Sequence, residues 1–60
     1  MPEQLLLTPE RAADRLDVGR TTVYELIASG QLDSVKIGRA RRIPAEALVA
    51  YVERLRNQAA

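Results

Sequence analysis

The chain has 60 residues, a formal net charge of +1, no cysteine and no histidine. Sixty residues form one domain, near the lower size limit for a self-supporting core. Without cysteine or histidine we expect no disulfide, no metal, no cofactor and no enzyme. The apolar run Leu5–Leu7 is far too short for a signal peptide or a membrane span, so we expect a soluble, cytoplasmic protein with no membrane partner.

The small net charge conceals an asymmetry along the chain. Residues 1–33 carry six acidic and three basic side chains, whereas residues 34–60 carry six basic and two acidic ones. Four of the seven residues from Lys36 to Arg42 are basic and none is acidic. This distribution predicts a segment that binds a polyanion within a nearly neutral protein.

The first predicted helix follows a short lead-in, Met1–Leu7. Thr8 can cap free N–H groups, and Pro9 suits the first helical position because the N–H that it lacks would be unpaired there. The helix is expected to run to about Leu16, with Ala12, Ala13 and Leu16 on its inner face.

A second helix is predicted after the interruption at residues 17–19. It runs from about Arg20 to Ser29, and Gly30 ends it. At 100° per residue, Val23, Leu26 and Ile27 share the inner side. Two short helices joined by a three-residue turn that contains glycine are typical of a helix-turn-helix.

The next segment is predicted to be a β-hairpin with a basic tip. Val35 and Ile37 alternate with polar neighbours, as in a half-buried strand, residues 38–40 turn the chain, and residues 41–43 return it. The register of the hairpin, and therefore which of Arg41 and Arg42 points outward, stays open.

Pro44 is predicted to open a third helix with one amphipathic stripe and a frayed end at Asn57–Ala60. The stripe comprises Ala47, Leu48, Tyr51, Val52 and Leu55. On this stripe Tyr51 is interpreted as a core residue whose hydroxyl reaches the surface, not as a nucleophile.

In a helix-turn-helix, the N-terminus of the second helix enters the major groove of DNA. Arg20 can read guanine, Thr21 and Thr22 can contact bases or phosphates, and the Tyr24 hydroxyl can donate to a phosphate. Alternatively, Arg20 is a solvated side chain and Thr22 bonds the backbone of its own first turn. The role of Glu25 on this face is left open.

The basic residues of the hairpin are the second group of candidate DNA contacts. Arg39, at the tip, could enter the narrow and electronegative minor groove, while Lys36, Arg41 and Arg42 hold flanking phosphates. The alternative is an edge strand that charge protects from aggregation.

Together these residues resemble the excisionase-type winged helix-turn-helix domains, which are related to the DNA-binding domains of MerR-like regulators. The resemblance covers about residues 6–55. It departs from the family pattern at Asp17, where glycine is frequent, at Gly19, where a capping serine is usual, and at Glu25, where arginine is frequent. The matching segments are Leu7-Thr8-Pro9-Glu10, Ala12-Ala13, Leu16-Asp17-Val18, Thr22-Val23-Tyr24, Leu26-Ile27, Ser29-Gly30, Val35-Lys36-Ile37-Gly38-Arg39, Arg42-Ile43-Pro44 and Ala47-Leu48.

The resemblance implies one mainly helical domain over residues 1–60, with its core in residues 6–56. Its parts are a helix-turn-helix, a two-stranded wing (the basic hairpin) and a C-terminal helix. The implied function is that of an excisionase, or recombination directionality factor, of a phage or mobile element. Such a protein binds repeated double-stranded DNA sites beside an attachment site, together with further copies of itself. It bends the DNA and directs an integrase towards excision.

Two other functions remain open. One is a small transcriptional regulator with the same DNA surface, and the other is a protein-interaction module whose basic hairpin binds an acidic partner. A length of only 60 residues favours the excisionase over a MerR-like regulator, which normally carries a dimerisation helix and an effector domain.

Overall fold

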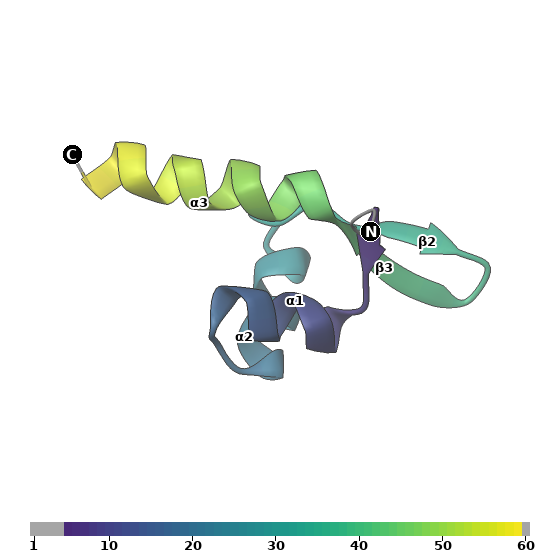
Figure 1. The fold of residues 1–60 in the computed structure, drawn as a ribbon. Coiled ribbons are helices and arrows are strands. Elements are labelled where there is room, and N and C mark those ends of the chain that lie inside the picture. Colours follow the sequence, from purple (N-terminus) through teal and green to yellow (C-terminus); the bar gives the residue numbers. More distant parts are fainter. Residues whose placement is uncertain (1–4, 60) are drawn as a thin grey trace.

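The computed structural model describes residues 5–59, and within that range it contains three helices and a three-stranded sheet (Figure 1). This mainly helical fold with a small sheet confirms the predicted class. The residues Met1–Gln4 of the predicted lead-in lie outside the described range. In chain order the elements are β1 (Leu6–Leu7), α1 (Pro9–Leu16), α2 (Arg20–Ala28), β2 (Val35–Ile37), β3 (Ala40–Pro44) and α3 (Ala45–Ala59).

Helix α1 begins and ends where the sequence predicts. The Thr8 side chain accepts a hydrogen bond of 3.1 Å from the backbone N–H of Arg11, and Pro9 occupies the first turn. The helix ends because Asp17 adopts the left-handed conformation, with φ of 59°. Aspartate is one of the few residue types besides glycine that visit this region, so the turn forms although the usual glycine is missing.

Helix α2 packs against α1 and is slightly shorter than predicted. It ends at Ala28, and Ser29 is its C-cap instead of its last helical residue. Gly30 follows with φ of +81°, a conformation that glycine adopts without steric cost and that ends the helix.

The sheet has one more strand than predicted, and β3 is its middle strand. Leu7, expected in the lead-in, pairs with Ile43 of β3, while Ile37 of β2 pairs with Ala40. Strand β3 is long enough to pair with β2 along its first part and with β1 along its last part. A two-residue strand such as β1 shows no alternating pattern that a sequence could display.

The buried core is a single cluster of aliphatic side chains where α1, α2, β3 and the start of α3 meet. Ile43 and Val23 are fully buried, and Ala12 lets a neighbouring element approach closely because its side chain is small. Leu32 was not predicted as a core residue, but this residue of the loop that follows α2 is only 2% exposed. The cluster consists of Leu7, Ala12, Ala13, Val23, Leu32, Ile43, Ala47 and Leu48.

Two predictions for the hairpin were wrong. Strand β2 is not half-buried: Val35 is 40% and Ile37 58% exposed, because the hairpin projects beyond the core (Figure 1). The turn contains two residues and not three, since Ala40 already pairs in β3. Gly38 has φ of +61° there, which suits the first position of a tight two-residue hairpin loop.

Two predictions for the last helix were also wrong. Pro44 is the last residue of β3, and α3 begins at Ala45, whose N–H donates to the Leu5 carbonyl at 2.9 Å. Of the end Asn57–Ala60 that was predicted to fray, residues 57–59 are helical, which fits the high helix propensity of arginine, glutamine and alanine, and Ala60 lies outside the described residues.

The amphipathic stripe of α3 is buried only in its first half. Leu48 is buried and Tyr51 half-buried against the core, whereas Val52 is 39% and Leu55 44% exposed. The reason is visible in Figure 1, where the C-terminal half of α3 extends past α1 and α2. No helix in residues 5–59 combines the length and apolar character needed to cross a bilayer.

Candidate nucleic-acid interface

Helix α2 divides into an inner and an outer side as predicted. Val23 is fully buried, and Leu26 and Ile27 pack against the core from partly buried positions. Thr21 and Tyr24 are exposed on the opposite side, Tyr24 to 45%. The outer side of α2 is therefore accessible to a ligand.

The N-terminus of α2 has no side chain that caps it. Its N-cap is Gly19, its first turn contains no acidic residue, and the first backbone bond runs from the Val23 N–H to the Gly19 carbonyl at 3.3 Å. The N–H groups of residues 20–22 therefore face outward with the partial positive charge of the helix end. Such an end suits an anion.

Helix α1 has the opposite kind of N-terminus. Thr8 caps it, and Glu10 lies in its first turn, where a negative charge is favourable. The two ends differ because the capping positions differ, threonine in one case and glycine in the other. Of these two helices, only α2 lacks a side chain that caps its N-terminus.

The predicted residues of the α2 first turn lie together at this end. Thr21 and Thr22 are exposed, and no hydrogen bond joins the Thr22 hydroxyl to the backbone within residues 5–59. Both hydroxyls are thus available to a base or a phosphate.

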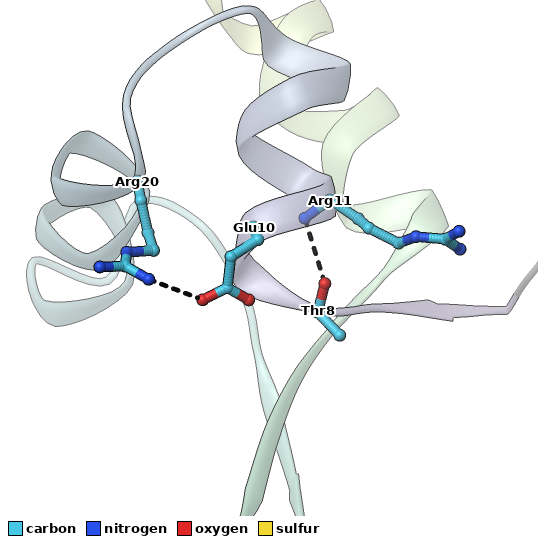
Figure 2. A network of polar contacts seen from close by, with 4 residues as sticks. All are labelled: Thr8, Glu10, Arg11 and Arg20. Carbon is cyan, nitrogen blue, oxygen red and sulfur yellow. Dashed lines mark hydrogen bonds and ion pairs between the residues drawn. The ribbon is translucent and has the colours of Figure 1, made fainter.

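Arg20 is not simply solvated, because it reaches back to α1. Its Nη1 lies 3.3 Å from Oε2 of Glu10, and the two side chains are 65% and 53% exposed (Figure 2). The sequence did not indicate this ion pair. The two residues are ten positions apart, and only the way α1 and α2 cross brings them together.

The β2–β3 pairing settles the register of the basic hairpin, defined as residues 35–42. Lys36 lies directly opposite Arg41, and Val35 lies opposite Arg42. Arg41 is exposed and Arg42 half-buried. Because side chains alternate along a strand, Lys36 and Arg41 share the sheet face of buried Ile43, the face that meets the helices, while Arg42 lies on the other face.

Two of the hairpin arginines, Arg41 and Arg42, make local hydrogen bonds. Arg41 Nη1 donates to Ser34 Oγ at 2.7 Å, and Arg42 Nη1 donates to the Arg41 carbonyl at 2.9 Å. Like charges directly opposite each other, as at Lys36 and Arg41, destabilise a strand pair. A bound anion would relieve that repulsion.

Arg39 occupies the exposed tip of the hairpin, next to Gly38. Within the described part of the chain it has neither a hydrogen bond nor an ion pair. Its guanidinium is therefore free to enter a groove.

Arg54, a basic residue of α3, has a structural role. The Arg54 guanidinium donates to the Gln31 carbonyl and lies 5.8 Å from the centre of the Tyr51 ring. These contacts join α3 to the loop after α2. Tyr51 itself packs against the core from a partly buried position, which agrees with its interpretation as a core residue.

The fold and these residues define a helix-turn-helix domain. Residues 6–56 match the family model described as "Helix-turn-helix domain", and the chain belongs to this family. That membership supports DNA binding. No solved structure gives a significant match.

Several curated proteins are similar to this chain. A probable excisionase of Saccharopolyspora erythraea is 53% identical over 92% of this chain and 56% of its own length. An excisionase of Streptomyces ambofaciens is 46% identical over 83% of this chain and 79% of its own length. A putative antitoxin, VapB50, of Mycobacterium tuberculosis is 37% identical over 95% of this chain and 44% of its own length.

The chain thus spans about half the length of most of the curated relatives that it matches. Its 60 residues consequently favour neither the excisionase nor the regulator. The family match concerns the helix-turn-helix domain, which is common to the excisionase and the regulator hypotheses.

The open N-terminus of α2 generates a stability prediction at Gly19. Its φ of −74° suits any residue, and a Cβ there would meet nothing within 4 Å. Gly19→Ser adds a hydroxyl that accepts from the first-turn N–H groups, so we expect about 0.3 kcal/mol of stabilisation. Gly19→Ala is the matched control and should be less stable than the wild type. Thermal unfolding measures both, and a Gly19→Ser variant no more stable than Gly19→Ala would show that this end is not a free capping site.

Proposed function

We propose that this protein is a non-catalytic, sequence-specific DNA-binding protein that acts as an excisionase. The observation that carries the proposal is the uncapped N-terminus of α2, with Arg20, Thr21 and Thr22 exposed around it, in a helix-turn-helix domain. The 53% identity to a probable excisionase supports the more specific role.

In this proposal α2 lies in the major groove. Arg20 reads guanine, Thr21 and Thr22 contact bases or the adjacent phosphates, and the exposed Tyr24 hydroxyl donates to a phosphate. The uncapped N–H groups of the first turn add a further phosphate contact.

The basic hairpin acts as the wing of a MerR-like winged helix-turn-helix. Arg39 enters the minor groove next to the site of α2. Lys36 and Arg41 hold phosphates from the sheet face that meets the helices, and Arg42 holds one from the other face. The near-neutral net charge keeps non-specific binding weak, so that affinity depends on the correct site.

The proposed biological role is recombination directionality for a mobile element in the cytoplasm. One helix and one hairpin bury little DNA surface, so a single copy binds modestly. Several copies then occupy neighbouring repeats beside an attachment site, bend the DNA and contact an integrase. No catalytic residue of this chain takes part in strand exchange.

A small regulator is the second candidate function. The putative antitoxin that matches 95% of this chain shows that a protein with another assigned role carries the same kind of domain. The third candidate function is a protein-interaction module whose basic hairpin binds an acidic partner. This function requires that the chain bind no duplex DNA at low salt.

The hairpin tip provides the test of DNA binding. We expect Arg39→Ala to bind duplex DNA more weakly than the wild type. The slope of the logarithm of the binding constant against the logarithm of the salt concentration should be shallower by about one, because one phosphate or minor-groove contact is lost. Arg56→Ala removes the same charge from the far end of α3 and should leave the slope unchanged (Figure 1). Equal slopes for the wild type and Arg39→Ala would remove the hairpin tip from the interface.

Excision with a cognate integrase distinguishes the first two candidate functions. We expect the purified chain to protect repeated sites next to an attachment site in a footprint, and to be required for excision but not for integration. Footprints confined to a promoter, with excision unaffected, would favour the regulator.

A further inference from the structure

Arg20 is held by a carboxylate from the other helix of the helix-turn-helix. Glu10 lies in the first turn of α1, Arg20 is the first residue of α2, and one contact of 3.3 Å joins Nη1 to Oε2 (Figure 2). Both side chains are more than half exposed, so the pair lies on the surface beside the uncapped end of α2.

The contact occupies only part of the guanidinium. Arginine has five N–H groups, and the bond to Glu10 engages those of Nη1 alone. The edge formed by Nε and Nη2 is left free. That edge has the geometry of a bidentate donor, which matches the O6 and N7 acceptors of guanine in the major groove.

The Glu10 charge also discriminates between ligands. A phosphate that approached Arg20 would bring its negative charge close to the Glu10 carboxylate, and like charges at such a distance repel each other. The guanine edge is neutral and meets no such repulsion. The ion pair therefore disfavours a backbone contact by Arg20 more than a base contact.

We propose that Glu10 is a specificity-determining positioning residue. By holding Nη1 of Arg20, it makes this arginine a reader of guanine and prevents it from acting as a general phosphate contact. The inference rests on the proposed DNA-binding function and adds a role for a residue of α1 that acts through Arg20.

The test begins with a duplex that the wild type selects from a randomised library. On a scrambled duplex we expect Glu10→Gln to bind about two- to fivefold more tightly than the wild type, the range that an exposed ion pair allows. Its salt dependence should be steeper by about one, because Arg20 gains a phosphate contact. Its preference for the selected duplex over one with a single guanine replaced should fall by a similar factor.

Glu46→Gln is the matched control. Glu46 has the same position in the first turn of α3 and changes the net charge equally, but it does not contact Arg20. It should shift binding to all duplexes alike and leave the guanine preference intact. Thermal unfolding midpoints establish that each variant is folded.

A double-mutant cycle completes the test. Arg20→Ala should lose the guanine preference, and adding Glu10→Gln should then shift binding to all duplexes alike, as Glu46→Gln does, without a further change in that preference. The proposal is overturned if Glu10→Gln behaves like Glu46→Gln, or if its effect on the guanine preference persists without Arg20. A wild type that selects no duplex would instead overturn sequence-specific DNA binding, and the role of Glu10 with it.

Discussion

The burial of Ile43 in the middle strand is the constraint on which the rest of the structure depends. Strand β3 pairs with β2 on one edge and with β1 on the other, and Ile43 is fully buried against the helices. This side chain fixes which face of β3 meets the core. Alternation then places Lys36 and Arg41 on the face that meets the helices. The position of the basic hairpin relative to α2 thus follows from one buried isoleucine.

The second organising feature is the contrast between the two helix N-termini. Helix α1 is capped by Thr8 and carries Glu10, whereas α2 begins after Gly19 with no cap. Helix α2 lacks the stabilisation that a serine at position 19 would provide. The N–H groups of its first turn are left available to an anion. Glu10 contributes twice, because it lies at the positive end of α1 and also pairs with Arg20. Local helix chemistry and the proposed recognition surface therefore share the same residues.

Much of this was predictable from the sequence, and the failures have physical causes. Thr8-Pro9 and Gly30 correctly marked helix boundaries because caps and positive φ angles are local properties. By contrast, β1, the burial of Leu32, the exposure of β2 and the Glu10–Arg20 pair all depend on how distant segments meet. The face of each hairpin residue became known only with the strand register. The candidate DNA-binding residues were named from the sequence alone, and their contacts with DNA remain a proposal.

The central claim is that the α2 N-terminus and the hairpin tip form one DNA-binding surface. The most direct test of this claim is to titrate the ¹⁵N-labelled chain with a selected duplex and to measure the amide chemical shifts by NMR. The largest shifts should fall at residues 20–22 and 38–39, while residues 52–56, on the part of α3 that extends past the other helices, should change little (Figure 1). Shifts concentrated on α3, with residues 20–22 unchanged, would contradict the account.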